Sequence, residues 1–340
     1  MRHISMSWNS LQNNKIMITG IPVLAACILL SLLAGNDAVT SAELLRALTG
    51  AGGSRTTQIV LYQIRIPRTA ACLLCGSSLS VAGLLLQEAL SNPLASPGIM
   101  GINSGAGLFV LLSGICFPHV YSVRNAAAFA GALLSAILVF LIARKAGMSK
   151  SVIILAGVAV SSLMTAASNT IITLHPESVS DKVGFSMGSL AGIDLQRLPL
   201  PALLIFVGIA AAFFLGPGIE LFAIGDEAAQ GLGLAVARHR KLTVCCAVLL
   251  ASAAVCLCGL LGFVGLIVPN ILRLSDQLTV RRKILGCIVW GSNLVLVCDT
   301  LMRTLFYPYE LPAGLLLSLI GTPFFILILM RRGIRGKWHD

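Results

Sequence analysis

Charged residues are scarce in this chain. Asp, Glu, Lys and Arg make up 11% of its 340 residues, whereas a soluble domain contains about 25%. Hydrophobic residues make up 57%, and the mean hydropathy is +0.93. So few polar side chains cannot cover a globule of this size with a water-facing surface. We therefore expect an all-helical integral membrane protein, a single domain spanning 1–340 with lipid around most of its surface.

The sequence also lacks the short motifs of common enzymes. It contains no G-x-x-x-x-G-K-[ST] loop for nucleotide phosphates, no H-E-x-x-H zinc motif and no G-x-S-x-G nucleophile motif. Its five histidines are scattered along the chain. We therefore expect no catalytic residues and no metal site, and if ATP drives this protein, a separate subunit hydrolyses it.

Acidic residues are nearly absent from the apolar stretches. Glu88, Asp299, Arg303 and Glu310 fall near the ends of predicted spans, and a charge at mid-helix costs at least about 2.5–3.5 kcal/mol. An ion-coupled secondary transporter requires buried carboxylates, so this scarcity favours another source of energy. That transporter class stays an alternative, as does a membrane enzyme acting on lipid or haem, for which we find no paired catalytic residues.

Long stretches without Asp, Glu, Lys or Arg define the predicted spans, because about 20 apolar residues cross a hydrocarbon core. The stretches are 16–34, 69–87, 89–123, 125–143, 151–176, 198–219, 242–272, 284–298 and 311–330. The stretch 242–272 is long enough for two helices, with a break near 262–265. In 89–123, Pro93, Pro97 and Gly98 predict a non-helical segment before one helix at 99–115. The sequence therefore predicts ten transmembrane helices.

An even number of spans places both termini on one side of the membrane. With the termini in the cytoplasm, most of the 24 Lys and Arg residues fall on the cytoplasmic side, as the positive-inside rule requires. We expect the first stretch to be a retained span rather than a cleaved signal. The net charge of +11 is then explained by anionic lipid as a partner and does not indicate nucleic acid.

The ten cysteines lie in or beside apolar stretches. We interpret them as small packing residues rather than as disulfide or zinc ligands, including the pair at Cys72 and Cys75.

Two membrane stretches are interrupted by glycine and proline, at 92–98 and at 259–269. Broken helices at corresponding positions of two halves often mark a transport path. Gly and Pro are also common in membrane helices generally, so the pattern alone does not decide between the two interpretations.

The loop 219–241 is the most structured-looking loop on the predicted cytoplasmic side. Asp226 is placed to cap a short helix, and Gly231 and Gly233 end that helix and allow a turn into a second one. Two such helices would form a rigid knob that fits a groove of a partner. An ordinary structured loop is the alternative.

Three arginines fall on the predicted outer side, although most Lys and Arg residues fall on the cytoplasmic side. Arg65 and Arg68 flank Pro67 just before the second span, and Arg303 lies at the outer end of the ninth. One explanation is docking to carboxylates of a partner protein, and the other is snorkelling to lipid phosphates.

Several strings, in this order and spacing, make the chain resemble the FecCD-type permeases of ATP-binding-cassette importers, which carry ferric siderophores, ferric citrate, haem and cobalamin. Besides Gly83 and Gln87, the strings are IRIPR at 64–68, NPLASPG at 92–98, GINSGAG at 101–107, LAGVA at 155–159, MGSL at 187–190, GDEAAQGLG at 225–233, GFVGLIVP at 262–269, ELPAG at 310–314 and GTPFF at 321–325. Asp299 and Arg303 complete the pattern.

The resemblance implies a cobalamin-importer-like permease of ten helices in a bacterial inner membrane. It implies a second permease chain, identical or different, an ATPase dimer that binds ATP and Mg²⁺, and an extracytoplasmic substrate-binding protein. Ferric siderophore or ferric citrate is the expected cargo, with haem and cobalamin left open.

The resemblance also implies roles for individual residues. Arg65, Arg68 and Arg303 would dock the binding protein. The inner gate and translocation path would include Asn92, Pro93, Leu94 and Ala95. The ATPase coupling loop would include Gly225, Asp226, Glu227, Ala228, Ala229, Gly231, Leu232 and Gly233. Asn270 departs from the histidine that family members often carry, so a role resting on that histidine is in doubt here.

Overall fold

The computed structural model describes residues 19–34, 39–49, 54–117, 120–147, 149–176, 179–273, 278–307 and 309–336. Within these ranges the regular secondary structure is helical, without a β-strand. Six helices are long and apolar enough to cross a membrane, and four apolar helices are shorter. Together they match the ten predicted spans. The predicted residues 16–18 of the first span and the topogenic Arg2, Lys15 and Lys337 lie outside the described residues.

The long helices run between short surface elements. The apolar helices are Thr19–Leu33, α4 (Ile66–Ala89, continuous with α3, Arg55–Ile59, and the π-helix Val60–Arg65), α5 (Ile102–Cys116), α6 (Tyr121–Lys145), α7 (Lys150–Leu174), α9 (Pro199–Glu220), α11 (Val236–Cys258), α12 (Val264–Arg273), α13 (Val280–Leu305) and α14 (Ala313–Gly336). The short elements are α2 (Ser41–Leu48), α8 (Val179–Met187), α10 (Asp226–Gly231) and the 3₁₀ turns Pro97–Met100, Leu195–Arg197 and Leu221–Ile224.

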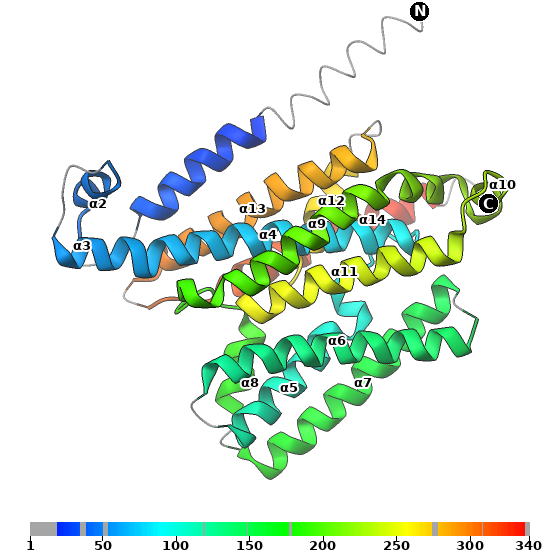
Figure 1. Cartoon of the computed structure of the whole chain (residues 1–340), viewed down its shortest axis with the longest axis horizontal. Coiled ribbons are helices and arrows are strands. Elements are labelled where there is room, and N and C mark those ends of the chain that lie inside the picture. Colours follow the sequence, from blue (N-terminus) through cyan, green and yellow to red (C-terminus); the bar gives the residue numbers. More distant parts are fainter. Residues whose placement is uncertain are drawn as a thin grey trace, which may run out of the picture.

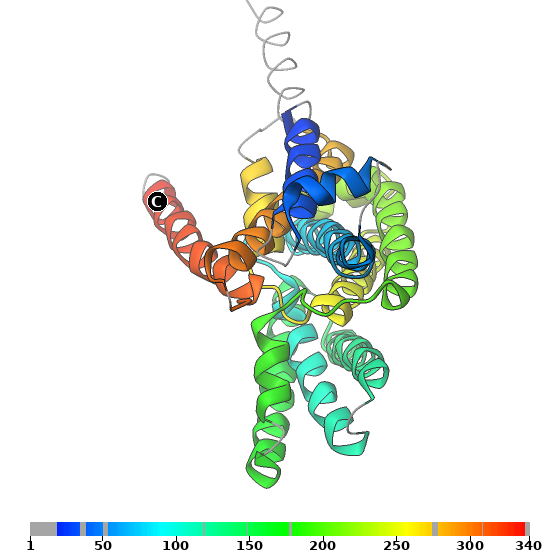
Figure 2. The same ribbon diagram turned by 90° about the vertical axis from the view of Figure 1, so that its left-hand side faces the viewer.

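Helix α4 forms the centre of the bundle. It packs along α13, α11 and α12, and its apolar stretch is mostly buried inside the chain. Helices α5, α6, α7 and α8 form a second group beside it (Figures 1 and 2). In the long direction, α2 and α3 lie at one end of the molecule and α10 at the other (Figure 1). These are called the α2 end and the α10 end below.

Glycine allows α4 to approach its neighbours at backbone distance. A Cβ on Gly83 would overlap the carbonyl of Gly265 in α12, and one on Gly76 would overlap the carbonyl of Gly291 in α13. Because lipid gives no hydrophobic drive between helices, such close packing supplies much of their association.

Three prolines lie inside the described membrane helices, Pro217, Pro269 and Pro323. Two of them, Pro217 and Pro269, free a carbonyl four residues earlier that accepts from a side chain of another helix. Pro269 in α12 frees the Gly265 carbonyl, to which the Gln87 side chain of α4 donates at 3.1 Å. Pro217 in α9 frees the carbonyl of Phe213, which accepts from Arg281 Nε at 3.2 Å. Neighbouring helices thus satisfy the backbone groups that these two prolines release, as a low-dielectric interior requires.

The second interruption differs from its prediction in position and in consequence. The helix stops at Cys258 and restarts at Val264, so the break covers 259–263, and Pro269 lies inside α12. Helix α12 has 10 residues, which span about 15 Å, half of a hydrocarbon core. In the segment 259–263, the Leu260 amide donates to the carbonyl of Phe185 at 3.1 Å.

Helix α2 begins after its N-cap residue Thr40. Thr40 accepts from the Glu43 amide while the Glu43 carboxylate accepts from the Thr40 amide, which forms a complete capping box.

Candidate functional site

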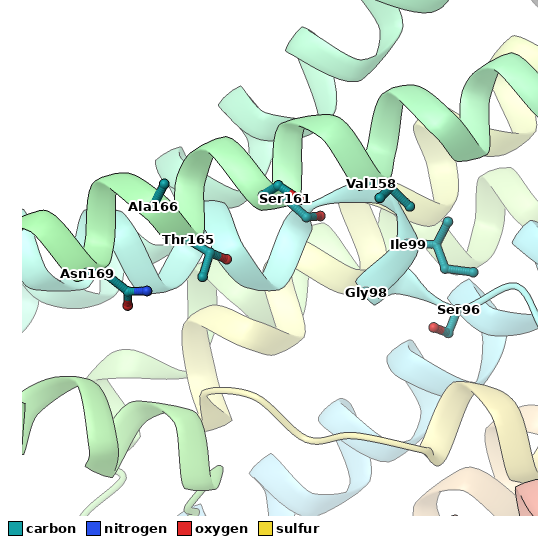
Figure 3. A pocket seen from close by; sticks show the side chains of 9 residues that line it. Ser96, Gly98, Ile99, Val158, Ser161, Thr165, Ala166 and Asn169 are labelled. Carbon is teal, nitrogen blue, oxygen red and sulfur yellow. The ribbon is translucent and has the colours of Figure 1, made fainter.

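A groove of about 660 Å³ runs along α7 and the start of the 97–100 turn (Figure 3). Its lining is mainly apolar or neutral polar: Ser96, Gly98, Ile99, Val158, Ser161, Ser162, Thr165, Ala166 and Asn169. Ser161, Thr165 and Asn169 recur every four residues, so they share one face of α7. Among the residues that the structure describes, no charged side chain lines this groove.

Residues 92–95, which were predicted to form the inner gate and are called the gate segment below, directly precede the groove residue Ser96. The Asn92 side chain accepts from the Leu94 amide at 3.0 Å, which forms a tight turn. Pro93 and Ala95 are buried, whereas Asn92 and Leu94 are half-buried. Asn270 of α12 donates to the Pro93 carbonyl at 2.9 Å and to its own helix at Leu266. The segment is therefore non-helical, as predicted, and it is fixed by α12.

The turn after the gate segment contacts α7 without an intervening side chain. A Cβ on Gly157 would overlap the carbonyl of Ile99. Gly101 ends this turn at φ +70°, a left-handed conformation that favours glycine, and α5 starts at the next residue. The 97–100 turn and α7 thus pack directly against each other.

The loop at the α10 end contains one short helix rather than two. Gly225, at φ +95°, is the N-cap of α10, and Gly233 lies at φ +87° after it ends. The predicted second short helix is the first part of the spanning helix α11. Asp226 does not cap α10, since its carboxylate binds Arg240 of α11 instead.

The described loop residues form an exposed knob. Glu227, Ala228, Gly231, Leu232 and Gly233 are exposed, and Ala229 is buried beneath them. The Leu232 side chain is 67% exposed.

The three outer arginines lie close together at the α2 end, and all three are buried. Arg65 donates to the Leu32 carbonyl at 2.8 Å, and Arg303 donates to the Ser31 carbonyl at 2.7 Å. These carbonyls belong to the last turn of the Thr19–Leu33 helix, where they lack helical donors and carry the negative end of the dipole. The two arginines therefore cap that helix.

Arg68 forms the third contact, a buried ion pair. Its guanidinium donates to both oxygens of Asp299 at 2.9–3.2 Å, and it reaches Glu310 at 2.7 Å. Arg68 and Asp299 are 4% and 1% exposed. Docking of these arginines to a binding protein stays a prediction, and the contacts observed within the chain tie the first helix, α4 and α13 together.

Sequence reasoning missed several partners. Ser161 and Thr165 were not singled out from the sequence as site residues, although their four-residue spacing with Asn169 marked a polar face. Arg240 and Lys150 counted only as topogenic charges. Among the described residues, no three His, Cys, Asp or Glu side chains gather in a way that would hold a metal ion.

Comparisons with known proteins agree with this architecture. The FecCD transport family matches residues 23–331. The Fe(3+)-citrate import system permease protein YfmD of Bacillus subtilis is 34% identical over 304 residues, covering 89% of this chain and 90% of the relative. The vitamin B12 import system permease protein BtuC of Yersinia enterocolitica is 31% identical over 283 residues, covering 82% of this chain and 84% of the relative.

A solved structure shares the fold. It is described as an inward-facing conformation of a metal-chelate type ABC transporter, has a TM-score of 0.81 at 24% identity, and the match covers 94% of this chain and 99% of that one. The arrangement of ten apolar helices is thus a known permease fold. With a family match over most of its length, this chain belongs to the FecCD transport family.

Proposed function

We propose that this chain is the membrane-spanning permease subunit of an ATP-driven importer, and that its cargo is a ferric chelate of the citrate or siderophore type. The observation that carries the proposal is the family match over 23–331 together with relatives that import ferric citrate. A separate subunit hydrolyses ATP, and an extracytoplasmic binding protein delivers the chelate.

The groove along α7 suits a bulky chelate. Its hydroxyl and amide groups and its apolar positions offer a permissive surface without a fixed charge. Such a lining passes a large polar complex without holding it tightly, so specificity resides in the binding protein. The gate segment 92–95, with the copy from a second permease chain, closes the inner end of the path.

The exposed knob at the α10 end fits the role of the ATPase contact. Gly225, Asp226, Glu227, Ala228, Ala229, Gly231, Leu232 and Gly233 would seat in the ATPase dimer, and ATP binding would move them. This orientation places the α10 end and both termini in the cytoplasm and the chain in a bacterial cell membrane.

The outer arginines act at the other end of the molecule. Because Arg65, Arg68 and Arg303 are engaged within the chain, we infer that they shape the surface that the binding protein meets. Direct ion pairs to that protein would require these side chains to leave their present partners.

A vitamin B12 importer is the second candidate, because BtuC is 31% identical to this chain. Uptake assays with ferric citrate, ferric hydroxamate and cobalamin, each with its cognate binding protein, discriminate between them.

The proposal is tested by purifying the tagged chain in mild detergent and identifying its partners. We expect an ATP-binding-cassette ATPase that is lost when residues 225–229 are replaced by a flexible Gly-Ser segment. The matched control replaces residues 41–45 of the surface helix α2 and keeps the ATPase. A chain that purifies alone and transports with an ion gradient would contradict the proposal.

A further inference from the structure

We propose that Asp226 is the positioning residue through which the ATPase moves the inner gate. The inference rests on the proposed function and names one residue and its contacts as the link between the exposed knob and the gate segment. The link consists of Asp226, Arg240, Lys150, Ser91 and the Ala89 carbonyl, and it is called the Asp226 hub below.

The first connection joins α10 to α11. Asp226 is the first residue of α10, and its two carboxylate oxygens accept from one Arg240 nitrogen at 2.7 and 2.8 Å. The Arg240 side chain is buried, and its guanidinium carbon lies 5.4 Å from the centre of the Phe222 ring. A planar guanidinium held by an aromatic ring and a carboxylate has little freedom to move alone.

The second connection joins the same guanidinium to α4. Arg240 Nε donates to the carbonyl of Ala89, the last residue of α4, at 2.9 Å. Carbonyls in the last turn of a helix lack intrahelical donors, so this bond satisfies a group that is otherwise unpaired. Asn92, the start of the gate segment, follows three residues later. Asp226 is therefore linked through one rigid side chain to the residue that precedes the gate.

The third connection joins Asp226 to α7, which lines the groove. Lys150 is the first residue of α7, and its ammonium lies 3.3 Å from Asp226. The same ammonium donates to the Ser91 hydroxyl at 2.9 Å. Ser91 has φ +47°, a left-handed conformation that is uncommon for serine. The residue immediately before the gate segment is thus in a strained conformation, and the hub holds it by a side-chain bond.

The opposite side of the α4 terminus has a separate anchor. Glu88 lies 3.2 Å from Arg273 of α12 and 3.4 Å from Lys283 of α13. One face of this helix end is therefore held to α12 and α13, and the other face is held to the knob through Asp226. A displacement of α10 pulls on the contacts made through Asp226 and leaves the Glu88 contacts in place. It therefore moves residues 90–95 relative to α12.

The hub is charged under ordinary conditions. The hydrogen bond from Arg240 lowers the pKa of Asp226, and Lys150 adds to the effect. An ionised carboxylate is what both cations require, so the link is intact at neutral pH.

The test uses the whole complex of permease, ATPase and binding protein in proteoliposomes, with ferric citrate as the probe. Uptake and ATP hydrolysis are measured together. For Asp226→Asn we expect at least a tenfold fall in chelate taken up per ATP hydrolysed, measured on complexes purified with the ATPase bound. Asp226→Glu keeps the carboxylate and most of the coupling, whereas Arg240→Lys loses it because one ammonium cannot replace the planar bridge.

Amide hydrogen exchange tests whether a change at the knob reaches the gate segment, an effect that a purely structural role of Asp226 would not produce. In wild type, a non-hydrolysable ATP analogue changes exchange in both 225–233 and 90–96. In Asp226→Asn the change is confined to 225–233. Asp194→Asn removes an exposed carboxylate near Arg197 and serves as the matched control.

Two results overturn the hub: unchanged uptake per ATP in Asp226→Asn, or loss of ATPase binding in that variant, which would make Asp226 a docking residue. Failure of the wild-type complex to use ATP for uptake overturns the proposed function itself, and the two failures are therefore distinguishable.

Discussion

Replacing Arg68 by Ala tests whether the outer arginine cluster stabilises the fold. Arg68 and Asp299 are 4% and 1% exposed and share three contacts of 2.9–3.2 Å. Removing one partner of such a pair leaves a buried charge and costs about 3–5 kcal/mol. At about 1.4 kcal/mol per factor of ten, the unfolding equilibrium shifts by roughly 100- to 4,000-fold. The half-exposed Glu310 adds only about 0–1 kcal/mol.

The assay is equilibrium unfolding in mixed micelles with increasing denaturing detergent, followed by circular dichroism. The matched control is Arg197→Ala, which removes a surface pair at 3.6 Å and is expected to change stability by about 1 kcal/mol or less. The double variant Arg68→Met with Asp299→Leu should recover most of the loss, because neither charge of the buried pair remains.

A result in which Arg68→Ala destabilises no more than Arg197→Ala would refute this reasoning. It would return Arg68 to the role of a docking residue held only loosely within the chain. Recovery by the double variant with undiminished binding-protein affinity would show that the cluster acts through the fold.

Three further predictions follow from the contacts. Gly83→Leu should lower the yield of monodisperse protein because the side chain has no room against the backbone of α12. The control Gly107→Ala, with open space around its Cβ position, should leave that yield unchanged. Equal yields of the two variants would contradict the close packing of α4 on α12. Asn270→Leu leaves the Pro93 carbonyl without its donor, which costs about 1–3 kcal/mol of stability. This variant should raise ATP-independent leakage from proteoliposomes. Unchanged leakage would contradict the role of Asn270 in holding the gate segment. Arg240 and Lys150 lower the pKa of Asp226, so the difference in unfolding free energy between wild type and Asp226→Asn should be constant from pH 5 to 8. It should shrink as the pH falls below the ordinary aspartate pKa near 3.8. A difference that already shrinks between pH 8 and 5 would contradict the ion pair.

The membrane helices were predictable from the sequence because lipid imposes a simple requirement. A span must be apolar for about 20 residues, and interruptions by Gly and Pro stand out against that background. Ten helices and the non-helical segment after α4 follow from this requirement. The half-length of α12 does not, because it depends on whether residues 259–263 find backbone partners in other segments, as Leu260 does with Phe185.

The partners of single charges were not predictable in the same way. Arg68 and Asp299 are far apart in sequence, and only the packing of α4 against α13 brings them together. The same holds for Asp226 and Lys150. Asp226 at the start of a short helix has the sequence of an ordinary cap, and the presence of Arg240 one helix later decides its actual partner.

Uptake of radiolabelled ferric citrate by the reconstituted complex tests the central claim most directly. The chain, its ATPase and its binding protein are placed in proteoliposomes, and ATP and ionophores are varied independently. The account predicts uptake that requires ATP and the binding protein and that persists when ion gradients are abolished. Uptake by the chain alone, driven by a proton or sodium gradient and indifferent to ATP, would contradict it.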